Sequence, residues 1–286
     1  MDFRAAWRLV EPSVVGLGFE LGPRAEIIGT GFLVEPSDPG GRLANLIPIL
    51  TNNHVVRVLV RGEPPQLLPE AAAFFFVPGT GASEDGETVA MTWRSRVTLH
   101  GVGHLPPPAP VGRVPELIGI ETREVVVHEP ADLAMLLANR VEVQRIARTP
   151  VRLRETAVEV GMPVGLLGYP LGVSLRERMP ANEVQLTPLL QAGVLSGILP
   201  SPNTPFPLHF VADIHAHPGC SGSPVFDEEG EIIGVASAHR FHRSLVRDET
   251  GNPLGSHVRE ASSQLMVVPL SRLPKEFFDA LMQSQQ

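Results

Sequence analysis

Three residues that could together form a nucleophilic site occur along the chain in the order His54, Asp132, Ser221. Ser221 lies in the stretch PGCSGSP (218–224), where two glycines and two prolines predict a tight loop. His54 lies in LTNNHVV, and Asp132 lies in ADLAML. A serine hydroxyl is a weak nucleophile unless a neighbouring base takes its proton and an acid orients that base. The sequence therefore predicts Ser221 as nucleophile, His54 as general base and Asp132 as its orienting carboxylate.

The glycine-rich loop also predicts a site for a developing negative charge. Glycine adopts backbone conformations that other residues avoid, so two N–H groups can point to one position beside the hydroxyl. The backbone N–H groups of Gly219 and Ser221 are the candidates for this oxyanion hole. Cys220 is an alternative nucleophile, because a thiolate attacks well. We expect its side chain to point away from the cleft, which favours Ser221.

Six segments of the chain, in order, resemble those of the trypsin-like serine peptidases, and the bacterial HtrA-type and glutamyl-endopeptidase-type domains are the most similar. The segments are GTGFLV (29–34), LTNNHVV (50–56), ADLAML (131–136), GLLGYPLG (165–172), QAGVLSG (191–197) and DIHAHPGCSGSPVFDEEGEIIGV (213–235). One such motif alone would be weak. Six in the family's order make the resemblance specific, and they span most of the chain.

The resemblance implies an all-β fold of two six-stranded antiparallel β-barrels, with the catalytic cleft between them. Residues 1–148 would form the half that carries His54 and Asp132, and residues 149–286 the half that carries Ser221, within one peptidase domain. The chain's own pattern agrees, because 27 glycines and 29 prolines separate short apolar runs. Short helices are expected over Phe3–Val10, capped by Asp2, and near the C-terminus, where residues 273–282 carry an apolar stripe.

The apolar runs predict about six strands in each half, with the crossing between halves at residues 140–160. In the first half the strands are expected at Ser13–Leu21, Ala25–Val34, Leu46–Leu50, Ala71–Val77, Thr88–Leu99, Glu124–His128 and Asp132–Leu137. In the second half they are expected at Val164–Gly168, Gln191–Ile198, Leu208–Ile214, Pro224–Phe226, Glu231–Ala238 and Gln264–Val268.

The resemblance also implies a primary specificity pocket close to the nucleophile loop. His215 falls at the base of that pocket, and Ala236, Ser237 and Ala238 form its opposite wall, with His239 next to them. The wall position that is histidine in glutamyl endopeptidases aligns with Ala236, so glutamate preference is not carried over. A preference for acidic or polar side chains and one for small apolar side chains both remain open.

Composition excludes several other functions. The chain carries a net charge of −8, which argues against nucleic acid or an anionic membrane surface as the main partner. One cysteine and the absence of an H-E-x-x-H motif disfavour a metal centre, although histidines are numerous around the second half-site. No glycine-rich nucleotide motif occurs in a strand-to-helix setting. We therefore expect neither a metal nor an organic cofactor.

The sequence also carries signals of cellular location. The N-terminal stretch lacks a basic start followed by an apolar run, and no stretch reaches the length of about 18 apolar residues typical of a membrane span. Cys220 is the only cysteine, so no intrachain disulfide can form. These features predict a cytoplasmic protein in a reducing environment.

Two functions follow as hypotheses. The first is a serine endopeptidase that hydrolyses protein or peptide substrates through an acyl-Ser221 intermediate, with limited cleavage controlled by loop ordering or by a regulatory partner protein. The alternative is a catalytically silent barrel that binds peptides or a partner. The presence of all three candidate catalytic residues favours the enzyme. A fluorophosphonate probe that labels Ser221 distinguishes the two hypotheses.

Overall fold

The structure is a computed structural model that describes most of the chain's 286 residues. The described residues are 3–21, 24–35, 45–62, 66–76, 94–97, 99–102, 126–128, 132–145, 148–154, 157–170, 188–199, 202, 207–215, 217–248, 250 and 252–273.

The first half of the chain forms an antiparallel eight-stranded sheet in the order β7-β6-β1-β2-β3-β10-β8, with β9 also paired to β10. Its strands are β1 (Val14–Leu21), β2 (Arg24–Leu33), β3 (Leu46–Asn52), β6 (Ala71–Phe76), β7 (Arg94–Val97), β8 (Leu99–Val102), β9 (Val126–His128) and β10 (Leu133–Asn139). Two short strands, β4 (Val60–Arg61) and β5 (Gln66–Leu67), pair separately. The helices of this half are α1 (Arg4–Val10), η1 (Glu11–Ser13), α2 (Asn53–Leu59) and α3 (Arg140–Arg145).

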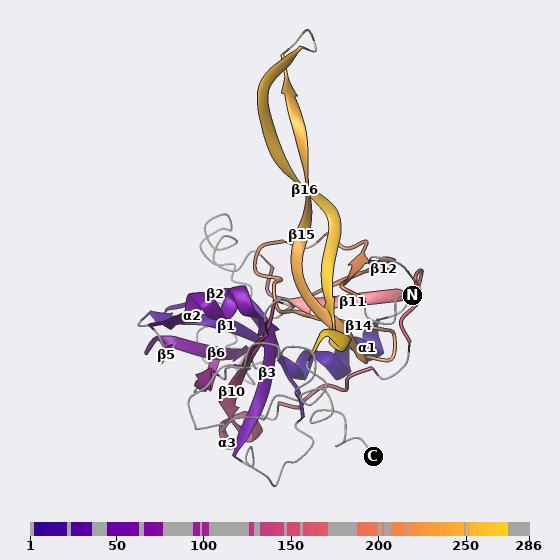
Figure 1. Ribbon diagram of the computed structural model, residues 1–286. Helices are drawn as coiled ribbons and strands as arrows, with labels where there is room; N and C mark the ends of the chain where they lie inside the picture. The colour runs from indigo at the N-terminus through magenta and orange to yellow at the C-terminus, as the bar shows by residue number, and fades with distance from the viewer. Residues whose placement is uncertain are drawn as a thin grey trace, which may run out of the picture.

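The second half forms a closed antiparallel barrel in the order β11-β12-β13-β16-β15-β14. The strands are β11 (Pro163–Gly168), β12 (Leu189–Leu199), β13 (His209–Ala212), β14 (Pro224–Phe226), β15 (Ile232–Arg247) and β16 (Pro253–Pro269), and η2 (Leu270–Arg272) follows. The predicted all-β, chymotrypsin-like arrangement is confirmed: the second half closes as a six-stranded barrel, and the first half forms a half-barrel sheet (Figure 1).

The segment of residues 148–154, between the two halves, joins them by backbone hydrogen bonds. The Val151 N–H donates to Leu33 O at 3.1 Å, and the Arg154 N–H donates to Ile232 O at 2.9 Å. This segment lies within the predicted crossing region, and it contacts β2 on one side and β15 on the other.

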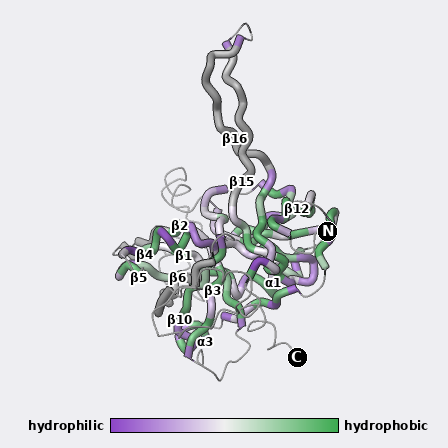
Figure 2. The backbone as a smooth tube through the Cα atoms, in the orientation of Figure 1, coloured by the Kyte–Doolittle hydropathy of each residue, from purple (hydrophilic) through white to green (hydrophobic). Residues whose placement is uncertain are grey.

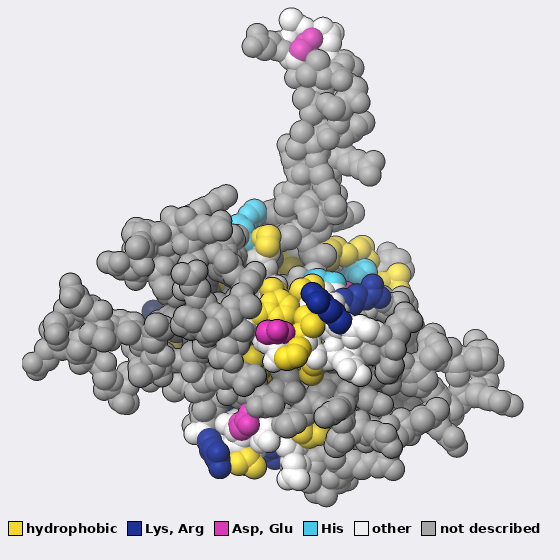
Figure 3. All heavy atoms as spheres, turned by 90° about the vertical axis from the view of Figure 1, so that its left-hand side faces the viewer, with side chains coloured by type: hydrophobic (Ala, Val, Ile, Leu, Met, Phe, Trp, Pro, Cys, Tyr) yellow, Lys and Arg dark blue, Asp and Glu magenta, His cyan; other side chains and the backbone are white. Residues whose placement is uncertain are grey.

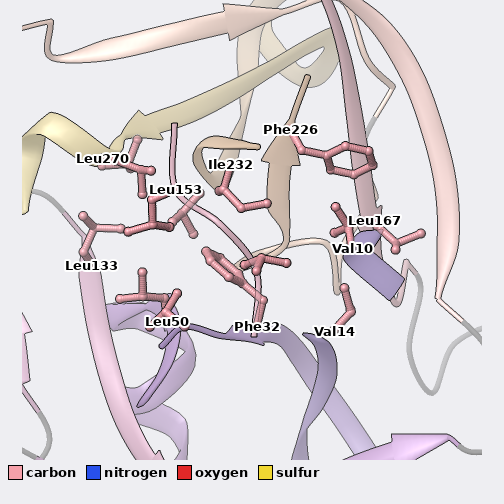
Figure 4. Packing of buried hydrophobic residues seen from close by; sticks show 14 of the residues in the cluster. Val10, Val14, Phe32, Leu50, Leu133, Leu153, Leu167, Phe226, Ile232 and Leu270 are labelled. Atoms are coloured by element: carbon pink, nitrogen blue, oxygen red, sulfur yellow. The ribbon is translucent and has the colours of Figure 1, made fainter. Parts of the chain in front are cut away.

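Among the described residues, the buried hydrophobic side chains form three clusters. One lies within the first sheet and one within the barrel, and hydrophobic residues line the strands of both bodies (Figure 2). The third is shared between the halves, so that Phe32 and Leu133 of the first sheet pack with Phe226 and Ile232 of the barrel (Figure 4). Burial of such side chains contributes roughly 1.5–3 kcal/mol each. The shared cluster therefore holds the two halves in one fixed arrangement.

The N-terminal segment packs across the second barrel. The Phe3 ring meets the Phe226 ring edge-on, with centroids 5.9 Å apart. Phe3 is the N-cap residue of α1, and no side chain caps this helix. The expected helix is therefore present, but it begins at Arg4. Asp2 lies outside the described residues, as does most of the predicted C-terminal helix.

The hairpin of β15 and β16 is much longer than the sequence predicts. Pairing continues from Gly234↔Pro269 in the barrel to Arg247↔Pro253 at the far end. The distal part rises away from the body as a two-stranded ribbon (Figure 1). Asp248 closes the turn at its tip, where its carboxylate accepts the N–H groups of Thr250 and Asn252.

Candidate active site

His54 lies in the first turn of α2, directly after β3 ends at Asn52. Its Nδ1 is 2.8 Å from Asp132 Oδ2, and its backbone N–H donates to Asp132 Oδ1 at 3.1 Å. An ionised carboxylate only accepts hydrogen bonds, so this contact places a proton on Nδ1 and leaves Nε2 able to accept one. The His54 side chain is 48% exposed, so a substrate group can reach its ring.

Asp132 is held in an unusual backbone conformation just before β10. Its φ is 51°, the left-handed region, which aspartate tolerates better than most residues. Its carbonyl oxygen accepts the backbone N–H of Asn53 at 3.2 Å and the side-chain amide of Asn52 at 3.0 Å. Such a conformation persists where surrounding contacts determine it, as these two asparagines do. The sequence TNNH thus places His54 and also fixes the acid that orients it.

The electrostatics of Asp132 favour its ionised form. Partial burial by itself raises the pKa of this carboxyl, but the hydrogen bonds from His54 and from the Ser237 hydroxyl outweigh it. The pKa of Asp132 therefore lies below its ordinary value. A carboxylate that stays charged at neutral pH can stabilise an imidazolium on His54.

Ser221 lies in the loop before β14, and backbone hydrogen bonds define the loop's shape. The Gly222 N–H donates to Ala236 O at 2.8 Å, and the Ser223 N–H donates to Cys220 O at 3.0 Å. At Gly222 φ is +86°, and a Cβ there would lie 1.9 Å from Thr30 O, so only glycine fits. In the described part of the chain, the N–H groups of Gly219 and Ser221 have no hydrogen-bond partner.

Ser237 connects the Asp132 carboxylate to Ser221. Its hydroxyl donates to Asp132 Oδ2 at 2.7 Å, and its carbonyl oxygen accepts the Ser221 hydroxyl at 3.1 Å. Ser237 belongs to β15, whereas Asp132 belongs to the first half of the chain, so the site is assembled across the two halves. Sequence reasoning placed Ser237 in a pocket wall and missed that its hydroxyl faces Asp132.

The other residues predicted to form the specificity pocket are described only in part. Ala236 is fully buried in the barrel core. His215 is exposed, and its ring lies edge-on to that of His217 with centroids 4.7 Å apart. Ala238 and His239 lie in β15 next to Ser237, and their side chains are outside the described atoms.

Cys220 is buried in the barrel core, 2% exposed, next to the nucleophile. Burial raises the pKa of its thiol to about 11, and a hydrogen bond between the thiol and the His217 backbone only partly offsets this. At neutral pH the thiol is therefore protonated and poorly reactive. Its burial agrees with the expectation that this side chain points away from the cleft.

Sequence reasoning also missed Thr30, a fully buried residue of β2. It contacts the nucleophile loop through both its backbone and its side chain: its N–H donates to Ser221 O at 2.8 Å, and its hydroxyl donates to Gly219 O at 2.9 Å. A polar residue in the otherwise small and apolar GTGF segment was the available signal.

Two further features of the described residues bear on function. No three His, Cys, Asp or Glu side chains among them gather as they would around a metal ion. Across the same ranges, no helix combines the length and hydrophobicity needed to cross a bilayer. On the face shown in Figure 3, the described side chains include basic, acidic and hydrophobic groups that lie near one another.

Comparisons with known proteins identify the family of the chain. The family model described as "Trypsin-like peptidase domain" matches residues 29–235, more than half of the chain. No curated protein sequence matches the chain. Among solved structures, the chain is similar to the inactive form of the Rv3671c protease, with a TM-score of 0.49, 14% identity, and 96% of this chain and 92% of that chain covered.

A serine-to-alanine mutant of Rv3671c from M. tuberculosis H37Rv, also in an inactive form, gives a TM-score of 0.47 at 14% identity, with 98% of this chain and 92% of that one covered. These identities are too low to transfer residue roles, whereas the family match covers Thr30, His54, Asp132 and Ser221. The chain therefore belongs to the family of trypsin-like peptidase domains.

Proposed function

We propose that this protein is a serine endopeptidase in which Ser221, His54 and Asp132 form the catalytic triad. One observation carries the proposal: Ser237 accepts the Ser221 hydroxyl with its carbonyl and donates its own hydroxyl to the carboxylate that holds His54. Nucleophile, acid and base thus belong to one hydrogen-bonded set that two halves of the chain assemble. The family match supports the same chemistry.

The reaction proceeds by acyl transfer. Ser221 Oγ attacks the substrate's carbonyl carbon while its proton moves to His54 Nε2, and Asp132 stabilises the resulting imidazolium. The carbonyl oxygen becomes an oxyanion that accepts hydrogen bonds from the Gly219 and Ser221 N–H groups. The tetrahedral species collapses, and the C–N bond breaks as His54 returns its proton to the leaving amine. Water, activated by the same base, then releases the acid product and free Ser221.

The resting position of the Ser221 hydroxyl adds a step to this mechanism. Its one proton is donated to Ser237 O, so it is not donated to His54 in the same arrangement. Rotation about the Cα–Cβ bond has to bring the hydroxyl towards the imidazole before attack. Side-chain rotations of this kind take picoseconds to nanoseconds and cost little compared with the chemical barrier.

The alternative is a silent barrel that uses the same cleft to bind peptides or a partner. The hydrogen-bonded contact between His54 and Asp132 argues against it, because peptide binding alone needs no oriented base. Extending the first proposal, we assign the protein to a reducing, cytoplasmic setting and to limited cleavage of protein substrates. The single cysteine supports the setting, since no disulfide is needed for this fold.

A cleavage profile from a peptide library tests the proposed function and reads out specificity in the same experiment. Wild-type protein should cut internal peptide bonds, and Ser221→Ala and His54→Ala should each lose at least roughly 10⁴-fold in kcat/KM. A preference for acidic or polar residues before the cut would implicate the His215 side of the loop, and a preference for small apolar residues would not. Equal cleavage by wild type and Ser221→Ala would overturn the proposal.

A further inference from the structure

We infer that the Thr30 hydroxyl is a positioning group for the oxyanion hole, an inference that rests on the proposed function. Thr30 belongs to the first sheet, whereas Gly219 and Ser221 belong to the barrel half. Thr30 nevertheless binds the carbonyl oxygens of both of these residues, one through its hydroxyl and one through its N–H. These are the two residues whose N–H groups are assigned to the oxyanion.

The geometry explains why the two carbonyls matter. The Ser221 N–H belongs to the Cys220–Ser221 peptide group. Thr30 binds the carbonyl oxygens of Gly219 and Ser221, which belong to the peptide groups immediately before and after it. The Gly219 N–H belongs to the peptide group just before the one whose carbonyl, Gly219 O, accepts the Thr30 hydroxyl. Gly219 has φ +96° and no side chain, so hydrogen bonds must hold its peptide groups. In the Gly219–Cys220 peptide group, the Cys220 N–H donates to His217 O at 3.0 Å, and the Thr30 hydroxyl holds the carbonyl on the other side of the same plane.

The hydroxyl is itself held in place. It accepts the backbone N–H of Tyr169 at 3.1 Å, which leaves its own proton for Gly219 O. Tyr169 directly follows β11, so the hydroxyl joins three separate segments: β2, the end of β11 and the nucleophile loop. Hydrogen bonds in such a chain polarise and strengthen one another in a buried, low-dielectric setting, and Thr30 is fully buried. The backbone of Thr30 is also fixed, since its carbonyl accepts the Thr51 hydroxyl at 2.7 Å.

The two contacts differ in what a substitution can remove. Any residue other than proline at position 30 keeps the N–H bond to Ser221 O, but only a hydroxyl residue keeps the bond to Gly219 O. Thr30→Val preserves shape and deletes the hydroxyl, whereas Thr30→Ser keeps it. Loss of one oxyanion-hole donor costs about 10²–10³ in kcat, and a mispositioned donor costs part of that. We expect Thr30→Val to lower kcat roughly 10–100-fold with KM nearly unchanged, and Thr30→Ser to restore most of it.

The test measures the rate at which phenylmethanesulfonyl fluoride inactivates the full chain. This reagent requires no known substrate. When Ser221 attacks its sulfonyl group, a sulfonyl oxygen requires the same N–H donors as the oxyanion of a substrate. Thr30→Val should react roughly 10–100 times more slowly than wild type and Thr30→Ser nearly as fast. Ser13→Ala is the matched control: it deletes a buried hydroxyl that donates to Val10 O at 2.7 Å, and it should alter thermal stability without slowing inactivation.

Each outcome has one meaning. If wild type itself does not react, the proposed function fails. If wild type reacts and Thr30→Val reacts equally fast, the inference about Thr30 is overturned while the proposed function stands. A slow Thr30→Val variant whose melting temperature matches that of Ser13→Ala supports positioning. If Thr30→Ser is as slow as Thr30→Val, the hydroxyl is not the group that matters and the inference fails.

Discussion

The two halves of the molecule position their parts of the site in different ways. In the first half, His54 and Asp132 meet through side-chain atoms and remain 48% and 33% exposed. In the second half, the nucleophile loop is shaped by backbone hydrogen bonds and lies against a closed barrel whose neighbouring side chains are buried. The base must stay open to solvent and substrate, whereas the loop must hold N–H groups in fixed directions. The proposed catalytic function would therefore depend on charge in one half and on backbone geometry in the other.

The largest effect is expected in the exposed half. Asp132→Asn keeps the shape of the side chain but favours the wrong tautomer of His54, so kcat should fall about 10⁴-fold. Stability should change far less, because the asparagine can retain the left-handed backbone at this position. Peptide cleavage rates and thermal melting of the same preparation check both statements. A loss of less than tenfold in kcat would show that the carboxylate does not orient the base.

The next effect belongs to the second half and concerns stability. Asp227, 1% exposed, binds Arg154 and accepts the N–H groups of Glu229 and Glu231 in the turn before β15. Asp227→Asn leaves the partly buried arginine without its counter-charge, so the free energy of unfolding should fall by about 3–5 kcal/mol. Urea denaturation of the wild type and Asp227→Asn measures this difference in the free energy of unfolding.

Asp248 offers a matched control for Asp227. It closes the hairpin turn with the same pattern, accepting N–H groups two and four residues later, but it is only partly buried, whereas Asp227 is 1% exposed. Asp248→Asn should leave the urea midpoint almost unchanged. If both variants were equally destabilised, burial of the charge would not be the cause of the effect at Asp227.

A smaller effect appears at alkaline pH. In the folded protein the pKa of Cys220 is about 11, against an ordinary value of 9.0. The unfolded chain therefore loses this proton first, and the folded chain retains it, so stability present below pH 9 is lost as pH rises towards 11. The loss amounts to roughly 2–3 kcal/mol.

Comparison with Cys220→Ala isolates the contribution of this thiol, because Tyr169, whose pKa burial also raises, is present in both proteins. Urea denaturation of the two proteins between pH 8 and pH 11 should give a shallower decline for Cys220→Ala. Identical slopes would mean that the thiol is not buried as described.

The smallest effect is expected where the two halves meet. Ser237→Ala removes the hydroxyl that donates to Asp132 Oδ2, but it leaves the carbonyl that accepts the Ser221 hydroxyl. The carboxylate keeps its bonds to His54, so kcat/KM should fall only about tenfold, equivalent to one hydrogen bond to a charged group. Steady-state assays measure this loss of kcat/KM. A loss as large as that expected for Asp132→Asn would show that the Ser237 hydroxyl is as important as the carboxylate for orienting His54.

The sequence predicted the fold class and most strands, because short apolar runs between glycines and prolines carry that information locally. Pro224–Phe226 matches β14, and Val164–Gly168 falls within β11. The expected strand over Thr88–Leu99 lies mostly outside the described residues. The β15–β16 hairpin was underestimated, since residues 239–262 alternate weakly between apolar and polar, although the DETGN stretch at 248–252 marks its turn.

The candidate site was predicted less completely than the fold. His54, Asp132 and Ser221 could be found because their types and local motifs point to chemistry. The structure brings His54 and Asp132 into contact and joins Asp132 to Ser221 through Ser237. Thr30 and Asn52 were missed, because their roles depend on contacts 189 and 80 residues away along the chain. Motif spacing does not report such contacts, since only the packed halves create them.

Labelling by a fluorophosphonate probe, followed by mapping of the modified residue by mass spectrometry, tests whether Ser221 is an activated nucleophile. If His54 and Asp132 activate Ser221, the wild-type protein should carry one label, on Ser221. Labelling should be absent in Ser221→Ala and slowed by several orders of magnitude in His54→Ala. Equal labelling of wild type and Ser221→Ala, or a label on Cys220, would contradict the account.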